Sequence, residues 1–201
     1  MTGEPALCFI DIETSGLDPE FDVILEIGAM TVDKDLNVIA IFQQVVQWDK
    51  IEYDAMRNIY TPPFGVHKDV VVMHEKNGLW EESYRCKDDL WMGITNFDEW
   101  LFNHIPAPAE GQEKIPIAGN SVWFDRDFLS RAGVPLGKWF HYRQVDVSSI
   151  KTLHRLWLPG TENDKPDYKS ETHRAVADCH ESIQELKWYR QQIFAPLGGG
   201  A

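Results

Sequence analysis

Two carboxylates near the start of the chain, Asp11 and Glu13, flank one isoleucine within an apolar, β-branched run. Side chains alternate along a β-strand, so both carboxylates would project from one face while Ile12 points into apolar surroundings. Carboxylates this close repel each other and raise their own pKa values unless a cation lies between them. The pair therefore predicts oxygen ligands for a divalent metal ion, typically Mg²⁺ or Mn²⁺. A bare pair of this kind is also common at solvated strand ends.

Further acidic groups lie in the middle of the chain and near its end. Asp125 and Asp127 are two residues apart in a predicted helix, so they point to different faces and should not share one metal ion. His173 and Asp178 are separated by about 500° of helical rotation. They can reach one site only if His173 lies in a loop or first turn and Asp178 lies within the following helix. Taken singly, each of these groups is explained equally well as a solvated surface charge.

The elements that must position these side chains follow from hydrophobic periodicity. Alternating or β-branched runs predict strands at 6–12, 24–32, 36–47, 115–118 and 143–147. Helical patterns with their stop signals predict helices at 66–76, 87–104, 122–131, 148–157 and 175–193. The first three strands resemble an antiparallel meander, and the whole pattern predicts a mixed α/β sheet with helices packed on it. One domain is expected over 1–195, with surface loops at 48–65 and 158–170 and a disordered tail at 196–201.

Charge and cysteine usage narrow the class of protein. A net charge of −13 argues against tracking along duplex DNA, because phosphate neutralisation normally requires a basic footprint. It does not argue against a small nucleic-acid ligand in a metal-filled pocket. No apolar run approaches the ~20 residues that span a bilayer, and the first residues do not read as a secretory signal. Three scattered cysteines, at 8, 86 and 179, fit buried positions in a cytoplasmic protein.

The five groups in this order resemble the DEDD exonuclease superfamily, in the branch that carries a histidine, across essentially the whole domain. The closer resemblance is to the oligoribonuclease family. It rests on the run Ile-Asp-Ile-Glu-Thr-Ser-Gly-Leu-Asp-Pro at 10–19, Gly-Asn-Ser at 119–121, Phe-His-Tyr-Arg at 140–143 running into Asp-Val-Ser-Ser at 146–149, and His-Arg-Ala at 173–175. The segment 48–65 departs from the family, because its loop tryptophan is not found there and Asp69 occupies roughly its place.

The resemblance implies an RNase H-like fold and a 3′–5′ exoribonuclease that degrades short single-stranded RNA, down to dinucleotides, to nucleoside 5′-monophosphates. It implies two Mg²⁺ or Mn²⁺ ions, with the metal ligands being Asp11, Glu13, Asp125 and Asp178. It also implies that Asp11 bridges both ions, that His173 accepts the proton of the attacking water, and that the protein is a homodimer. RNA oligonucleotides are the expected partner, with DNA as a second option.

The same resemblance implies a set of substrate-binding residues: Leu17, His74, Ser121, Tyr142, Arg143 and Ser148. Ser121, Arg143 and Ser148 would hold the 5′ phosphate, and a second subunit would contribute Tyr142. Leu17 would wedge between the terminal bases, while His74 would stack on one. Ordinary packing would also explain Leu17 and Tyr142. An ion pair with Asp146 would also explain Arg143, although Asp146 better suits the cap of the next helix.

Three other functions remain open at this stage. The first is a related exonuclease that acts on single-stranded DNA or on longer RNA 3′ ends. The second is a phosphatase of the haloacid dehalogenase type, which needs an aspartate two residues after its nucleophile, where this chain has Glu13. The third is a non-catalytic nucleic-acid-binding module, which the complete set of five site residues argues against.

Overall fold

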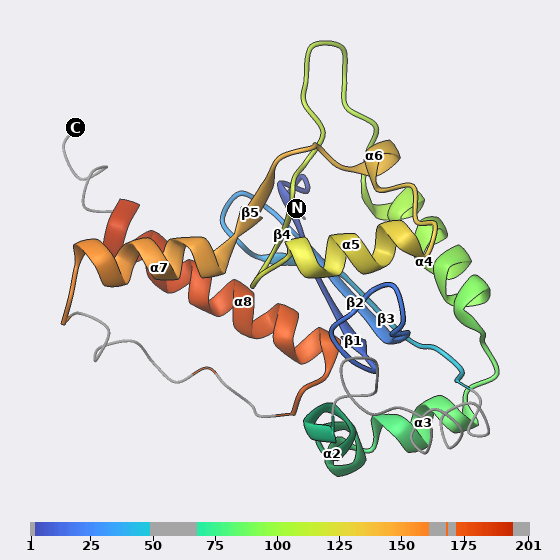
Figure 1. The fold of residues 1–201 in the computed structure, drawn as a ribbon. Coiled ribbons are helices and arrows are strands. Elements are labelled where there is room, and N and C mark those ends of the chain that lie inside the picture. The colour runs from blue at the N-terminus through green and yellow to red at the C-terminus, as the bar shows by residue number, and fades with distance from the viewer. Residues whose placement is uncertain (1–2, 49–67, 161–167, 169–171, 195–201) are drawn as a thin grey trace, which may run out of the picture.

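A single mixed sheet forms the centre of the molecule. The computed structural model describes residues 3–48, 68–160, 168 and 172–194. Its strands are β1 (Leu7–Thr14), β2 (Ile24–Val32), β3 (Val38–Val45), β4 (Ile117–Gly119) and β5 (Gln144–Asp146). They are ordered β3-β2-β1-β4-β5, with β1, β2 and β3 antiparallel and β4 and β5 parallel to β1 (Figure 1). The predicted meander with added parallel strands is confirmed.

The described helices are α2 (Lys68–Asn77), α3 (Leu79–Arg85), α4 (Leu90–His104), α5 (Trp123–Arg131), α6 (Leu136–Trp139), α7 (Val147–Trp157) and α8 (Ala175–Tyr189). A π-helical turn, η2 (Arg190–Phe194), follows α8. The helix predicted at 87–104 begins later, because the Asp89 side chain caps it by accepting the N–H of Met92 at 2.8 Å. The short helices α3 and α6 were not predicted.

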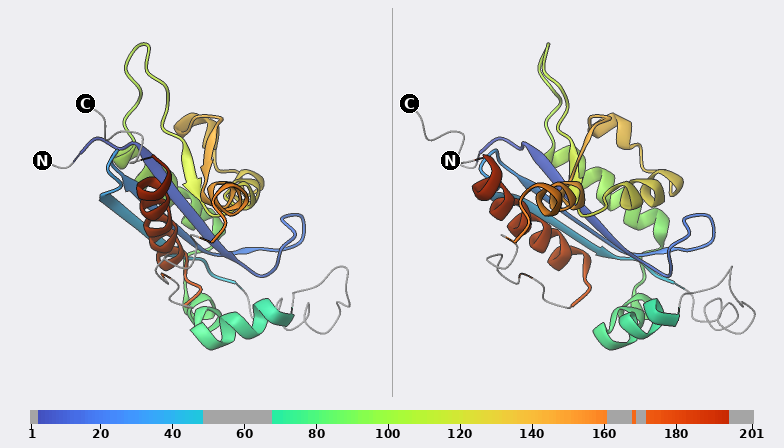
Figure 2. Two further views of the ribbon diagram at one scale, coloured as in Figure 1. Left: turned by 90° about the vertical axis from the view of Figure 1, so that its left-hand side faces the viewer. Right: turned by 60° about the vertical axis from the view of Figure 1, so that its left-hand side comes forward.

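Helices cover both faces of the sheet. Figure 2 shows α8 along one face and α4 on the other. The alternation in β1 sends Ile10 and Ile12 into the core that contains α4 and α5, and Phe9 into the core that contains α8. Burying one such side chain contributes about 1.5–3 kcal/mol, and a slip of one residue would exchange the two faces. The register that buries Ile10 and Ile12 therefore also directs Asp11 toward α8.

Several predictions about loops and cysteines can be compared with the described residues. Cys8 and Cys179 are buried, Cys86 is partly buried, and all three are free thiols. Most of the predicted loops at 48–65 and 158–170, and the predicted tail at 196–201, lie outside the described residues. Among the helices that are described, none has the length and apolar character needed to cross a membrane.

Candidate active site

Three carboxylates from two elements meet on the α8 face of the sheet. Asp11 and Glu13 come from β1, and Asp178 comes from the first turn of α8. One oxygen from each lies within 4.8 Å of the others. The predicted common face of Asp11 and Glu13 is therefore confirmed, and a carboxylate 165 residues later in the sequence joins them.

The start of α8 brings Asp178 to the strand. Helix α8 begins at Ala175, so His173 lies in the preceding loop and Asp178 within the helix, as its phase requires. Helix α8 can approach β2 closely because β2 has Gly28, which has no side chain, opposite Asp11. A Cβ at Gly28 would lie 2.6 Å from the carbonyl carbon of Ala175, too close for any side chain. Backbone packing between β2 and α8 thus sets the depth at which Asp178 enters the site.

Asp125 approaches the same strand from the other side of the site. It lies in the first turn of α5, is only 4% exposed, and accepts the backbone N–H of Ile12 at 2.9 Å. It is not one of the three carboxylates that converge within 4.8 Å. Asp127 lies on an exposed face and pairs with Arg131 at 3.6 Å. The predicted separation of the two aspartates onto different helix faces is confirmed.

Burial and mutual repulsion raise the pKa values of the carboxyl groups in this acidic cluster. Burial raises the pKa of Asp11 well above its usual range, and the carboxylates of Asp125 and Glu13 raise it further. Burial, then the charge of Asp178, raises the pKa of Glu13 to about 9. Burial raises the pKa of Asp125 to about 8 against the opposing N–H of Ile12, and it raises that of Asp178 to about 6. A divalent cation would relieve this repulsion, and its preferred ligands are the carboxylate oxygens present.

A cavity of about 1440 Å³ opens on the acidic cluster. Asp11, His173 and Asp178 are among its lining residues, and most of the others come from α2, α7 and α8. The His173 side chain is exposed to this space. The volume exceeds the 300–1,000 Å³ typical of small-molecule pockets, so the cavity has room for a dinucleotide.

Two of the predicted substrate-binding residues lie together at the edge of this cavity. The hydroxyl oxygens of Ser121 and Ser148 are 3.3 Å apart. Asp146 caps α7 by accepting the N–H of Ser148 at 2.9 Å, and it also accepts the N–H of Ser121 at 3.1 Å. The predicted capping role of Asp146 is confirmed. Ser148 also donates to the Oδ1 atom of Asn120 at 3.1 Å, which fixes its hydroxyl near the mouth of the site.

Tyr142 and Arg143 lie elsewhere in the same chain. Arg143 immediately precedes β5, whereas Ser148 follows it, so a strand length on the order of 10 Å separates them. Both residues are largely exposed, with Arg143 stacked over the Tyr142 ring at 5.2 Å and 3.9 Å from Glu113. Among the ion pairs of the described residues, Arg143 pairs with Glu113 and none joins it to Asp146.

The predicted role of His74 in stacking on a substrate base needs a correction. Its imidazole is 0% exposed, so in this structure it cannot stack on a substrate base. The ring Nε2 donates to the carbonyl of Thr14 at 3.0 Å, and Trp80 packs against it edge-on at 5.8 Å. His74 instead supports the end of β1 behind Glu13, whose carboxylate lies 3.7 Å away. Leu17 is 61% exposed in the loop after β1, and its role as a wedge stays a prediction.

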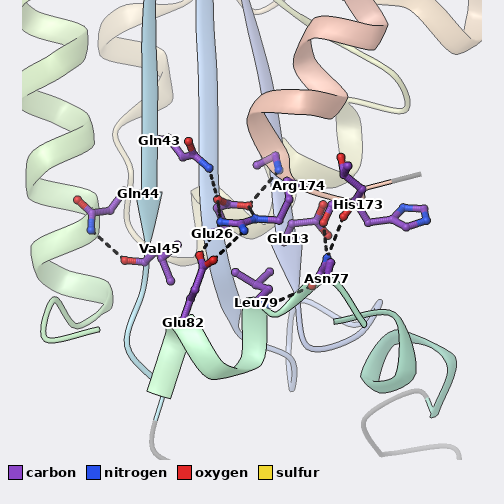
Figure 3. Close-up of polar contacts among 12 residues, drawn as sticks. Glu13, Glu26, Gln43, Gln44, Val45, Asn77, Leu79, Glu82, His173 and Arg174 are labelled. Atoms are coloured by element: carbon purple, nitrogen blue, oxygen red, sulfur yellow. Dashed lines mark hydrogen bonds and ion pairs between the residues drawn. The ribbon is translucent and has the colours of Figure 1, made fainter. Parts of the chain in front are cut away.

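A second group of charged residues next to the site was missed by the sequence analysis. Glu26 is wholly buried in β2 directly opposite Glu13, and Arg174 binds it through two hydrogen bonds (Figure 3). The available signal was the single glutamate in the otherwise apolar and small-residue strand 24–32. A buried charge in such a strand requires a partner, which here comes from the start of α8.

Comparison with known proteins gives the family and the fold. No protein-family model matches the chain. It is 39% identical to the oligoribonuclease of Mycobacterium sp. (strain KMS) over 194 residues, which cover 96% of this chain and 83% of that protein. Its identity to the oligoribonuclease of Mycobacterium leprae (strain TN) is 37%, with the same coverage.

Among solved structures, the zinc-bound complex of Escherichia coli exonuclease I with single-stranded DNA superposes with a TM-score of 0.64 over 94% of this chain, at 18% identity. Exonuclease I of Methylocaldum szegediense gives a TM-score of 0.63 over 93%, at 17% identity. The chain spans about two fifths of the length of these exonucleases, 41% and 40% respectively. This likeness concerns the fold, and it confirms the predicted RNase H-like arrangement.

The sequence identity to the mycobacterial oligoribonucleases extends over 96% of this chain and 83% of theirs. The chain therefore belongs to the oligoribonuclease family.

Proposed function

We propose that this protein is a 3′–5′ exoribonuclease that releases nucleoside 5′-monophosphates from short single-stranded RNA, down to dinucleotides. The observation that carries the proposal is the convergence of Asp11, Glu13 and Asp178 within 4.8 Å at a cavity with room for a dinucleotide. Relatives named oligoribonuclease at 37–39% identity give the substrate class. The phosphatase alternative has no support from this family.

The donor set fits two divalent cations, which we propose to be Mg²⁺ or Mn²⁺. Asp11 would contribute to both ions, Glu13 and Asp178 to the one beside α8, and Asp125 to the other. When bound, such a pair of ions stabilises the negative charge of the attacking and leaving oxygens in phosphodiester hydrolysis. The raised pKa values of Glu13 and Asp125 support cation binding here, because a bound cation favours the ionised form of neighbouring carboxylates.

His173 would take the proton of the attacking water. Its imidazole is exposed to the cavity and comes from the loop next to Asp178, and histidine is the side chain that most often serves as a general base. A base in this position raises the nucleophilicity of water at the moment of attack, which typically contributes 10²–10⁴-fold to the rate. The scissile phosphate would leave with the released nucleoside, and the shortened RNA would keep a free 3′ hydroxyl.

Ser121 and Ser148 would bind the 5′ phosphate of a short substrate. Their hydroxyls converge at the cavity edge, and Ser148 lies in the first turn of the eleven-residue helix α7. Backbone N–H groups at a helix N-terminus attract anions. A phosphate held here would end the path available to the RNA, which explains a preference for short chains.

A second copy of the chain would supply Tyr142. Tyr142 is 71% exposed and so is available to the phosphate site of a second copy, while Ser121, Arg143 and Ser148 would come from one chain. The exposed side chains of Trp123 and Trp157, 61% and 70% accessible, offer apolar surface for such an association. A homodimer would thereby complete the phosphate site in each subunit.

A length series tests the function directly. Single-stranded RNAs of two to about twenty nucleotides, digested with Mg²⁺ and resolved by length, should lose 3′ nucleotides as 5′-monophosphates, with the shortest cut fastest. A matched series of DNA serves as the comparison. Equal rates on long RNA or on DNA would favour the broader exonuclease, whereas products with 3′ phosphates would refute the proposed chemistry.

A further inference from the structure

His173 has a backbone conformation that residues with a side chain rarely adopt. Its φ angle is 45°, in the left-handed region, where the Cβ is crowded by the backbone. Such a conformation persists only where surrounding contacts impose it, and it clusters at functional sites. His173 occupies the loop between Thr172 and the N-cap of α8, Arg174. The contacts of this loop therefore decide where the imidazole lies.

Arg174 ties the loop to two separate elements. Its Nε and Nη2 atoms donate to Glu26 of β2 at 3.0 and 2.8 Å, and its Nη1 and Nη2 atoms donate to Glu82 of α3 at 3.1 and 2.7 Å (Figure 3). Two bidentate pairs on one planar guanidinium fix its orientation as well as its position. The backbone immediately after His173 is thus anchored to both the sheet and α3.

Asn77 ties the loop from the opposite side. Its Nδ2 atom donates to the carbonyl of His173 at 2.6 Å and to that of Thr172 at 3.2 Å. Its Oδ1 atom accepts the N–H of Leu79 at 3.0 Å, which holds the amide at the junction of α2 and α3. In Figure 3 the His173 imidazole points away from Arg174 and Asn77, and a dashed line joins its backbone to the Asn77 amide.

Glu26 binds Arg174 and is not one of the proposed metal ligands. It faces Glu13 across the strand pair, but its oxygens also accept the N–H of Ala175 at 3.1 Å and the side-chain amide of Gln43 at 2.6 Å. With Arg174 added, both carboxylate oxygens of Glu26 have hydrogen-bond partners. Arg174 is equally committed: four hydrogen bonds to two carboxylates use most of its five N–H donors.

We propose that Arg174 and Asn77 are positioning residues for the general base: together with Glu26 and Glu82 they form a brace that holds the His173 backbone in its left-handed conformation and so aims its imidazole into the cavity. The inference rests on the proposed role of His173 as the base. Both residues line the cavity, but their side-chain donors are committed to the loop carbonyls and to Glu26 and Glu82 rather than to the substrate. Losing the brace should therefore lower the rate of the chemical step and leave substrate and metal binding in place.

Two conservative variants test the brace. Arg174→Lys keeps the positive charge beside Glu26 but cannot bind two carboxylates bidentately. Asn77→Asp keeps the acceptor for Leu79 but removes the donor to the loop carbonyls. Glu81→Gln is the matched control. Glu81 lies in α3 next to Glu82 and pairs with Arg85 at 2.6 Å, so its substitution breaks an ion pair of that helix and leaves the brace intact.

Each brace variant should lower kcat by roughly 10–100-fold, the loss expected when a catalytic group is misplaced by about 1 Å. KM on a dinucleotide and the affinity for Mn²⁺, measured by calorimetry, should stay within about twofold of the wild type. In a His173→Ala background the same substitutions should cause no further loss, because they act only through the imidazole. A rise in KM at constant kcat would show direct substrate contact and overturn the inference, as would equal losses in both backgrounds.

The NMR signal of the His173 imidazole, assigned by its disappearance in His173→Ala, provides a readout independent of activity. In the wild-type protein it should be a single signal distinct from that of a free histidine, and both brace variants should move it toward the free value. If the wild-type protein released no 5′-monophosphate, the proposed function would fail, and this signal would still test the brace. An unchanged signal in both variants would overturn it.

Discussion

Replacing Glu13 by glutamine should stabilise the metal-free protein while abolishing its activity. Glu13 is buried next to Asp178, and burial with that neighbour raises its pKa from 4.5 to about 9. Glutamine has almost the same shape and carries no charge. Its amide can donate to Asp178, so the substitution removes a repulsive interaction and leaves no new cavity.

The sign and size of the effect follow from proton linkage. Between pH 4.5 and about 9 the folded protein holds a proton on Glu13 that the unfolded chain has released, so the free energy of unfolding falls as the pH rises through this window. At about pH 7.5 the limit is three pH units at about 1.36 kcal/mol each, or about 4 kcal/mol. Because Asp11 and Asp178 share the repulsion, we expect about 1–2 kcal/mol for the variant. At this chain length that raises Tm by about 2–8 °C.

Calorimetry in the presence of a chelator, at about pH 7.5 and about pH 5, measures the difference in Tm between Glu13→Gln and the wild type. The gain should be large at the higher pH and nearly absent at the lower one, and saturating Mn²⁺ should reverse the order by stabilising only the wild type strongly. Glu99→Gln, on the exposed side of α4, controls for the general loss of one negative charge. Equal melting temperatures of wild type and Glu13→Gln at both pH values would refute the reasoning.

Three further predictions concern catalysis. Asp125→Ala should abolish release of 5′-monophosphates while Asp127→Ala keeps most of it, and the reverse result in the same assay would show that the wrong aspartate was chosen. His173→Ala should lower turnover by roughly 10²–10⁴ with Mn²⁺ binding intact by calorimetry; lost binding would make it a ligand. Arg143→Ala should erase a roughly ten- to hundredfold preference in kcat/KM for a 5′-phosphorylated dinucleotide, and equal rates with and without that phosphate in the unsubstituted protein would contradict the phosphate site.

The strands were predicted more accurately than the short helices for a physical reason. Strands β1 to β3 pair antiparallel, and their apolar and β-branched runs are visible in the sequence. Predicted and observed bounds agree to within two residues at every end of these three strands. Helices α3 and α6, of seven and four residues, are too short to show a helical period. Burial of Leu79 and Trp80 stabilises α3 instead, and such tertiary contacts leave no local signal.

The same limit explains which parts of the site could be predicted. Asp11 and Glu13 share a face because of strand alternation, which is local. The meeting of Ser121 with Ser148 depends on the parallel pairing of Gly119 with Asp146, which only the fold provides. The burial of His74 depends on Trp80 in α3, a helix that periodicity did not predict.

The acidic character of the chain is consistent with a nuclease that accepts only short substrates. At a net charge of −13, phosphates that extend beyond the cavity meet repulsion over a Debye length of about 8 Å at physiological salt. Inside the cavity the balance differs, because Lys76 and Lys151 line its walls and two bound divalent cations would offset the carboxylates. A dinucleotide would place all its phosphates within this region, whereas each further nucleotide would add a phosphate outside it. Repulsion by the acidic surface and a closed 5′ phosphate site would therefore both disfavour long substrates. Selection for short RNA need not depend on steric exclusion alone.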